Sequence, residues 1–297
     1  MRFDPVYANT SAAAAPAKSD DLGNMPEWDL SDLYKGPGDI AVENDIADAS
    51  NDAARMKARY QGQLGELAKD GAKLAGAVKE YEALSDVMGK LGSYAGLYYA
   101  QSQADPIRAK FYGDVSENLT KISTNLIFFE LELNLIDDTV LAAALCHKDL
   151  KRYKPWFDDL LKEKPHQLDE KLETLFTEKS QTGRAAWNRL FNETMSSLKF
   201  DVAGEAAPLS LEPTLNMLSN ADGAKRKAGA DALSKTLSAN VPLFTLITNT
   251  LAKDKEISDR WRNFKDVADS RHLANRVEAP VVDALVSSVR AAYPRLS

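Results

Sequence analysis

The residue types that most often do chemistry in proteins are few in this chain. Among its 297 residues there are three histidines, His147, His166 and His272, and one cysteine, Cys146. No histidine is followed by glutamate and none has a second histidine four residues away, so the His-Glu-x-x-His zinc motif is absent. These side chains are also too scattered to form a structural zinc site by spacing. We therefore predict no metal ligand and no catalytic residue in this chain, and capping or surface roles for the histidines.

Cys146 cannot form an internal disulfide, because the chain has no second cysteine. A nucleophilic cysteine would need a base close by. The neighbouring His147 would point in a different direction on a helix. The favoured interpretation of Cys146 is a small, buried, apolar side chain.

Carboxylates are plentiful, but their spacing does not predict a shared site. Glu130 and Glu132, like Asp254 and Glu256, are two residues apart, and on a helix such side chains diverge by about 200°. We expect them on solvated faces, with Glu256 and Arg260 forming a surface ion pair. The sequence also lacks the glycine patterns of phosphate-binding loops and the Gly-x-Ser-x-Gly motif of a nucleophilic serine.

Arg184 with Trp187, and Arg260 with Trp261, are the combinations that could contact a peptide ligand. Stacking of these side chains within the protein is the favoured interpretation. Spacing alone does not identify which side chains touch a peptide.

The composition is that of an acidic globular protein. Hydrophobic residues make up 44% and charged residues 27%, and 37 basic against 44 acidic residues give a net charge of −7. An acidic chain repels phosphate backbones, which argues against a nucleic-acid partner. No segment approaches the ~20 apolar residues that cross a bilayer, and the N-terminal stretch lacks the apolar core of a secretory signal. We therefore expect a cytoplasmic protein with no membrane partner.

Helical periodicity dominates the chain and predicts a mainly α fold, a multi-helix array without a fixed repeat. The predicted helices cover 40–61, 74–99, 105–136, 140–145, 168–177, 185–198, 241–257 and 281–293, with Pro294 as the final stop. Further helices should begin after Pro213 and after Asp222 and run through Leu237. The glycines of 74–99 indicate either close approach of another helix or a kink near Gly92, and both interpretations stay open. One strand signal lies at about 199–211, where two alternating runs flank a turn and predict a β-hairpin that must lean on helices.

The same reading predicts three parts of the chain. Residues 1–24 have too little apolar surface to offset their ordering entropy and should form a disordered tail. Residues 25–198 should form an N-terminal helical domain. Residues 199–297 should form the hairpin and the helices that lead into a catalytic domain missing from this chain.

Five runs of sequence, in this order and spacing, resemble the oligoendopeptidase F type of zinc metallopeptidase, which is related to thimet oligopeptidase. The runs are PEWDLSDLY (26–34), FFELELN (128–134), EKSQTGRAAWNRLFNETMSSLKF (178–200), ITNTLAKDKEISDRW (247–261) and SRHLANRVEAPVVDALVSSVRAAYPRLS (270–297). The resemblance covers nearly everything from Pro26 onward.

The resemblance implies a two-lobed helical metalloendopeptidase that cleaves short peptides inside a deep channel. In that family, zinc is held by the two histidines of His-Glu-x-x-His and by a later glutamate, and the glutamate within the motif activates the attacking water. This sequence has no matching positions, so no catalytic or zinc-binding residue is carried over. What it does resemble is the N-terminal lobe, one wall of the channel, whose partner would be the missing C-terminal catalytic half.

Two hypotheses follow from the missing motif. In the first, the chain is an incomplete peptidase that neither binds zinc nor cleaves peptides alone, although the full-length enzyme uses Zn²⁺. In the second, it is a stand-alone helical module that binds peptides or proteins. The gene sequence beyond Ser297 separates them: an open frame encoding His-Glu-x-x-His supports the first, and a stop codon supports the second.

Overall fold

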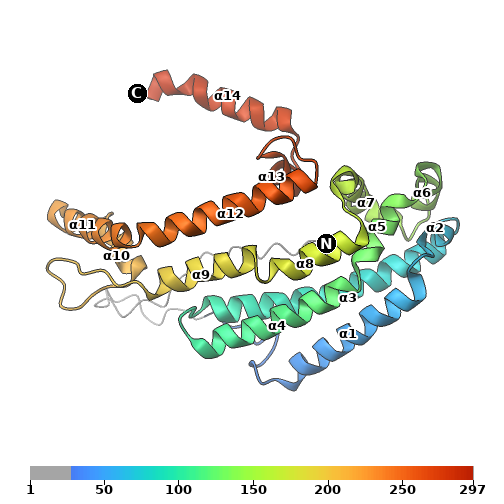
Figure 1. The fold of residues 1–297 in the computed structure, drawn as a ribbon, viewed down its shortest axis with the longest axis horizontal. Helices are drawn as coiled ribbons and strands as arrows, with labels where there is room; N and C mark the ends of the chain where they lie inside the picture. Colours follow the sequence, from blue (N-terminus) through green and yellow to red (C-terminus); the bar gives the residue numbers. More distant parts are fainter. Residues whose placement is uncertain (1–27, 297) are drawn as a thin grey trace. The chain divides into compact units, whose positions relative to one another are not determined.

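A computed structural model describes residues 28–296 and confirms the predicted mainly α fold (Figure 1). Within these residues there is no β-strand, only an isolated antiparallel bridge between Phe200 and Leu209. The tail predicted at 1–24 lies outside the described residues. Helical periodicity therefore predicted the fold class correctly, although several boundaries differ.

The helices follow one another along the whole described chain. The first are α1 (Ile40–Tyr60), α2 (Leu64–Leu67), α3 (Gly71–Ala100), α4 (Pro106–Thr124), α5 (Ile127–Leu135) and α6 (Asp138–Leu145). Next come the short 3-10 helix η1 (Lys151–Tyr153), α7 (Lys154–Glu163), the 3-10 helix η2 (Lys164–His166), α8 (Glu170–Ser180) and α9 (Arg184–Ser197). The last are α10 (Leu211–Met217), α11 (Gly223–Ala239), α12 (Val241–Trp261), α13 (Asp269–Ala274) and α14 (Ala279–Leu296). Sequence reasoning did not predict α2 or α13, each of which spans less than two full turns, and it also missed the ten-residue α7.

Aspartates directly before three helices explain where those helices begin. Asp105, Asp137 and Asp222 precede α4, α6 and α11, and each carboxylate accepts a hydrogen bond from the backbone N–H two residues later, at 2.8, 2.9 and 2.8 Å. Such caps satisfy backbone donors that have no partner inside the helix, and each stabilises its helix by about 1 kcal/mol.

The predicted single helix over 105–136 is wrong, because α4 ends before Asn125 and α5 begins after Leu126. The hydroxyl groups of Ser123 and Thr124 both donate to backbone carbonyls of the preceding turn at 2.8 Å. Side chains that bond to the local backbone compete with the helical ladder and favour a break.

The predicted stop at Pro294 is also wrong, since α14 continues through it to Leu296. Proline removes one backbone donor, and so near the end of a helix this deletes a single hydrogen bond.

The described chain divides into two compact units, each assembled from separate segments. Unit 1 contains the described residues as far as Met56, together with Glu80–Asn125 and Thr177–Leu251. Unit 2 contains Lys57–Lys79, Leu126–Phe176 and the described residues from Ala252 onward. The domain boundary predicted between residues 198 and 199 is not tested by this division into units, and it stays a prediction.

An aromatic cluster forms the larger core of unit 1. The ring of Tyr94 contacts the rings of Tyr34 and Phe111 edge-on, with centroids 5.1 and 5.8 Å apart. The Tyr34 hydroxyl donates to Asp45 at 2.6 Å, and the Lys90 ammonium pairs with the same carboxylate at 3.1 Å. This core therefore ties the segment before α1 to helices α1, α3 and α4.

The β-hairpin predicted at 199–211 is wrong as a pair of strands, although the chain does reverse there. Phe200 and Leu209 exchange two backbone hydrogen bonds of 2.9 Å, and Gly204 takes a positive φ of 92° in the turn. Phe200 and Val202 are buried with Ala232 and Leu233 of α11. Because these side chains pack on a helix, one bridge is enough to hold the reversal, which leans on helices as predicted.

Unit 2 has its own core, in which α5 packs against α2 and α7. Phe128, Phe129 and Phe157 are almost completely buried there. The Asn134 side chain donates to the carbonyl of Leu160 at 3.0 Å and joins α5 to α7.

Candidate functional surface

Two of the three histidines, His147 and His166, lie in packed positions. A Cβ atom at Gly71 would lie 2.6 Å from the Cβ of His147, so His147 marks the close approach of α6 to the start of α3. His166 stacks on Phe264 with ring centroids 3.9 Å apart, and its Nδ1 lies 2.8 Å from the carbonyl of Arg262. Among residues 28–296, no three His, Cys, Asp or Glu side chains are grouped so that they could hold a metal ion. The absence of catalytic and metal-binding residues stays a prediction.

Cys146 is exposed, so the predicted burial is wrong. It is the residue that follows the last turn of α6, and its Sγ lies 3.4 Å from the carbonyl of Ala142. At the end of a helix, some apolar side chains point toward solvent. The sequence alone did not show that Cys146 is one of them.

The paired carboxylates do not share a site. Glu132 accepts hydrogen bonds from the backbone N–H groups of Gly62 at 2.6 Å and Leu64 at 3.4 Å. It therefore caps the start of α2 instead of lying on a solvated face as predicted. The predicted pair of Glu256 and Arg260 is confirmed at 3.3 Å. A hydrogen bond from Lys253, followed by one from Arg260, lowers the pKa of Glu256.

A buried ion pair joins the end of α12 to α8. The Arg262 guanidinium donates to both carboxylate oxygens of Glu173, at 2.7 and 2.8 Å, and also to the carbonyl of His166 at 3.2 Å. The two side chains are only 9% and 14% exposed. Sequence reasoning missed this pair because its members are 89 residues apart and no local spacing links them.

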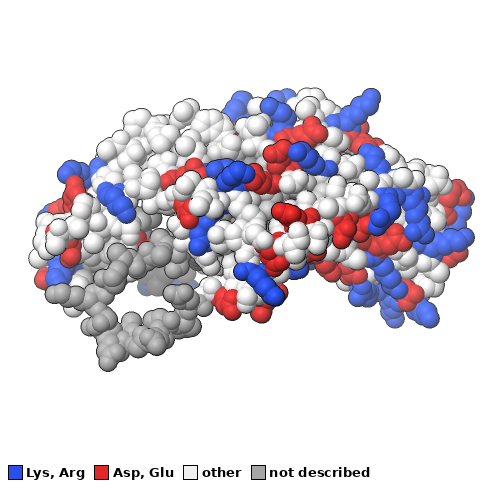
Figure 2. All heavy atoms as spheres, turned by 90° about the horizontal axis from the view of Figure 1, so that it is seen from below, with Lys and Arg blue, Asp and Glu red and all other residues white. Residues whose placement is uncertain are grey.

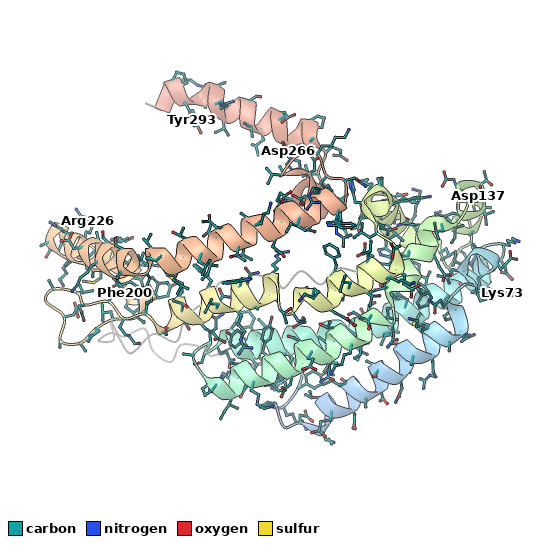
Figure 3. The ribbon with its side chains drawn as sticks, in the orientation of Figure 1. Lys73, Asp137, Phe200, Arg226, Asp266 and Tyr293 are labelled. Carbon is teal, nitrogen blue, oxygen red and sulfur yellow. The ribbon has the colours of Figure 1, made fainter. Side chains whose placement is uncertain are left out.

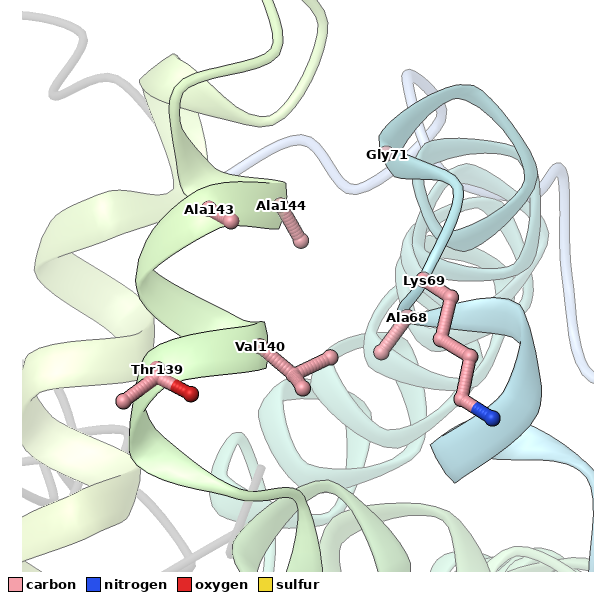
Figure 4. Close-up of a pocket in the computed structure, with 7 residues that line it drawn as sticks. All are labelled: Ala68, Lys69, Gly71, Thr139, Val140, Ala143 and Ala144. Carbon is pink, nitrogen blue, oxygen red and sulfur yellow. The ribbon is translucent and has the colours of Figure 1, made fainter.

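One shallow cavity in unit 2 lies between α6 and the connection from α2 to α3 (Figure 4). Its volume is about 350 Å³, and its lining is Ala68, Lys69, Gly71, Thr139, Val140, Ala143 and Ala144. The Lys69 ammonium pairs with Glu66 at 2.7 Å. The small side chains and the neutralised lysine give this cavity no group that would orient a ligand.

Both units expose large apolar side chains. Large hydrophobic side chains are exposed on the later helices of the chain: Leu190 and Phe191 of α9, Leu215 of α10, Val241, Leu246, Ile257 and Trp261 of α12, and Val281, Leu285, Val286, Val289 and Tyr293 of α14. We call these side chains the exposed apolar set. Trp261 is 47% exposed, while Arg260 beside it pairs with Glu256. Trp187 is half-buried on α9.

Charged side chains do not gather into a single-sign patch on the face drawn in Figure 2, where Lys and Arg are interspersed with Asp and Glu. Many are neighbours on one helix, such as Lys121 with Glu117 at 2.6 Å and Lys227 with Asp231 at 2.7 Å. In the described part of the chain, no helix combines the length and apolar content of a membrane-spanning segment.

Comparison with known proteins gives consistent relatives. The family model for oligopeptidase F matches residues 132–200. Oligopeptidase PepF of Bacillus subtilis is 25% identical over 279 residues, which cover 91% of this chain and 40% of that protein. Group B oligopeptidase PepB of Streptococcus agalactiae is 21% identical over 275 residues, covering 91% of this chain and 45% of that protein.

The fold has a counterpart among solved structures. The crystal structure of oligoendopeptidase-F from Enterococcus faecium matches with a TM-score of 0.75 and 18% identity, over 86% of this chain and 51% of that one. The chain spans less than half the length of the two oligopeptidases that it matches by sequence. The family model, the two sequence relatives and the solved structure all point the same way, to similarity with oligopeptidases of the oligoendopeptidase F type.

Proposed function

We propose that this chain is the N-terminal, substrate-channel lobe of a zinc-dependent oligoendopeptidase that hydrolyses short peptides in the cytoplasm. The observation that carries the proposal is the match over nearly the whole chain to less than half of two longer oligopeptidases. In such a protein the lobe would restrict entry to unfolded oligopeptides, because a rigid helical wall excludes folded proteins sterically.

The exposed apolar set supports the same proposal. Monomeric soluble proteins rarely expose large contiguous apolar patches, and larger ones mark surfaces that contact another polypeptide or a ligand. Here α9, α12 and α14 each expose several large hydrophobic side chains. The partner we propose for part of this surface is the C-terminal catalytic half of the longer protein.

Zinc chemistry is not assigned to the residues described here. A catalytic zinc needs three protein donors and an open position. Residues 28–296 offer no suitable group of His, Cys, Asp and Glu, so the described residues do not fit the metal. In this proposal the hydrolytic step belongs to the C-terminal half, and this lobe forms one wall of the substrate channel.

The test is a comparison of this chain alone with the chain joined to the C-terminal half of its own gene product. We expect the chain alone to bind no stoichiometric zinc and to leave fluorogenic short peptides intact. The joined protein should bind zinc and cleave these peptides. One tightly bound zinc per chain and peptide cleavage by the chain alone would contradict the proposal.

A stand-alone peptide- or protein-binding module is the second candidate, because the exposed apolar set is equally suited to docking. It predicts a natural stop codon after Ser297 and saturable peptide binding by the chain alone. Calorimetric titration with unstructured apolar peptides separates the two candidates, since a lobe that needs its catalytic half should show no saturable binding.

A further inference from the structure

The connection between α12 and α14 has little apolar packing but many polar contacts. It runs over residues 262–278 and includes the short helix α13. Asp266, labelled in Figure 3, lies in it between the end of α12 and the start of α14. Arg262 is the one buried side chain in this range. Surface connections with so few buried side chains open easily, so whatever holds this one must be polar.

Arg262 anchors the start of the connection to η2 and α8. The Glu173 carboxylate that pairs with its guanidinium also accepts a hydrogen bond from the backbone N–H of Leu168 at 3.0 Å. His166 completes the anchor from both sides. Its Nδ1 donates to the carbonyl of Arg262 at 2.8 Å, since a carbonyl can only accept, and its ring stacks on Phe264 at 3.9 Å.

The middle of the connection is tied to itself and to α12. The Asp269 carboxylate accepts hydrogen bonds from the backbone N–H groups of Asp266 at 2.8 Å and Lys265 at 3.2 Å. The Lys255 ammonium of α12 donates to the hydroxyl group of Ser270 at 2.8 Å. The stretch between the two bends of the chain is therefore folded as a unit.

A second anchor lies at the end of the connection. Arg276 pairs with Asp159 of α7 at 2.8 Å. Its φ is 55°, and Asn263, directly after the first anchor, has a φ of 59°. Left-handed backbone is unfavourable for residues with a Cβ atom, and more so for arginine than for asparagine. Each of these two bends therefore lies at a residue that an ion pair holds or directly follows one.

We propose that residues 262–276 form a locked elbow, in which Arg262 and Arg276 fasten both ends of the connection to the segment 159–173. All of these residues belong to the same compact unit. The chain cannot swing at either bend without breaking an ion pair. The elbow therefore sets the direction in which the chain enters α14, although no described side chain of α14 is buried.

A consequence for catalysis follows, and this part alone rests on the proposed function. In the longer peptidase the chain would continue from α14 into the C-terminal half. Arg262 and Arg276 would then be positioning residues, because they set where that half meets the channel wall. A misplaced wall lowers the rate, since the reacting groups reach productive geometry less often.

Limited trypsin digestion of the full chain tests the locked elbow. Lys265 and Arg271 are exposed within the connection, so cleavage after them measures how often the elbow opens. Arg262→Lys keeps the positive charge but loses the bidentate contact with Glu173, and should accelerate both cleavages at least about tenfold. Arg276→Gln breaks the more exposed anchor and should accelerate them about threefold.

Lys162→Gln is the matched control for Arg276→Gln. Lys162 pairs with the same Asp159 carboxylate at 3.8 Å, but it belongs to α7 and does not hold the elbow. Its variant should be cleaved at the rate of the unaltered chain. Because the anchor at Arg276 is partly exposed, its loss leaves the fold intact even where Arg262→Lys unfolds, and circular dichroism checks this. Cleavage of Arg276→Gln no faster than that of Lys162→Gln would overturn the locked elbow.

The positioning role is tested in the chain joined to the C-terminal half of its own gene product. Arg276→Gln should lower kcat about threefold and leave KM and zinc content unchanged. Arg276→Lys, which can keep an ion pair with Asp159, should restore kcat. An unchanged kcat in Arg276→Gln would reject the positioning role. A joined protein without peptidase activity would contradict the proposed function instead, while the trypsin rates of the chain alone still decide the elbow.

Discussion

Residues 28–168 and residues 169–296 differ in how they cover their apolar side chains. The earlier region buries large side chains in two units, among them Phe128, Phe129, Phe157, Leu91 and Leu133. In the later region the buried apolar residues are Phe200, Val202, Ala232, Leu233 and Ile247, while most of the large exposed ones belong to α9, α10, α12 and α14. Both regions are helical and amphipathic. The later helices therefore have the apolar periodicity of core-facing helices, but a smaller share of their large apolar side chains is covered.

The strongest test of this contrast compares one side chain from each region. Phe157→Ala should lower the free energy of unfolding by about 3–5 kcal/mol, because Phe157 is fully buried and its loss leaves a cavity. Leu285→Ala on α14 should change it by less than about 0.5 kcal/mol, as at other exposed positions. Urea denaturation of both variants measures the two values, and equal losses would break the contrast.

The ion pair of Arg262 and Glu173 is an exception, since it is a buried polar contact made by the later region. Arg262→Gln should destabilise the chain by about 3 kcal/mol, because it leaves the Glu173 carboxylate half-satisfied away from water. Arg260→Gln is the matched control, and its exposed pair with Glu256 should contribute at most about 1 kcal/mol. Thermal melts at neutral pH measure the loss of stability in each variant. If the Arg262 variant were as stable as the Arg260 control, the buried ion pair would not hold the end of α12 to α8.

Close packing in the earlier region can be tested with two glycines of α3. Gly71→Ala should destabilise by about 1–3 kcal/mol, because the new methyl group would lie 2.6 Å from His147 Cβ and 3.0 Å from the carbonyl of Ala144. Gly76→Ala meets nothing within 4 Å and should stabilise the helix by about 0.5–1 kcal/mol. Chemical denaturation should give changes of opposite sign in the free energy of unfolding of the two variants. If both variants were more stable than the unaltered chain, α6 could move away from the start of α3.

The exposed apolar set should make the chain alone self-associate at moderate concentration. Leu246→Glu on α12, where the side chain is 54% exposed, should reduce association with little effect on stability. Light scattering against concentration measures this, with Glu43→Gln at an exposed position of α1 as a surface control. A monodisperse monomer with a sharp cooperative melt would instead support a self-sufficient module.

The smallest effect at neutral pH concerns Tyr99 in the earlier region. Burial, together with the nearby Glu193 carboxylate, raises the pKa of Tyr99 to about 12. A raised pKa means that the folded state favours the neutral phenol, so this stability is present below pH ~10 and is lost as the pH rises toward ~12. Tyr99→Phe should flatten the loss of stability over that range. If the stability of the two proteins fell in the same way with rising alkaline pH, folding would not raise the pKa of Tyr99.

Several residues show how far sequence reasoning reached. The caps at Asp105, Asp137 and Asp222 involve only the next three residues, so the starts of these helices depend on residues close together in the chain. The pair of Glu256 and Arg260 was predicted for the same reason, since one helical turn fixes its spacing. Glu132 was misplaced on a solvated face, because the backbone that it caps lies 70 residues earlier.

The sequence by itself determined the mainly α fold class, most of the helices and the resemblance to the oligoendopeptidase F family, because these depend on residues close together in the chain. Only the tertiary structure decided which amphipathic faces are covered. Periodicity gives Leu133 and Leu285 the same apolar signature, yet the first is buried and the second is exposed. Burial depends on whether another element reaches that face. That is a property of contacts between distant segments, and no local pattern encodes it.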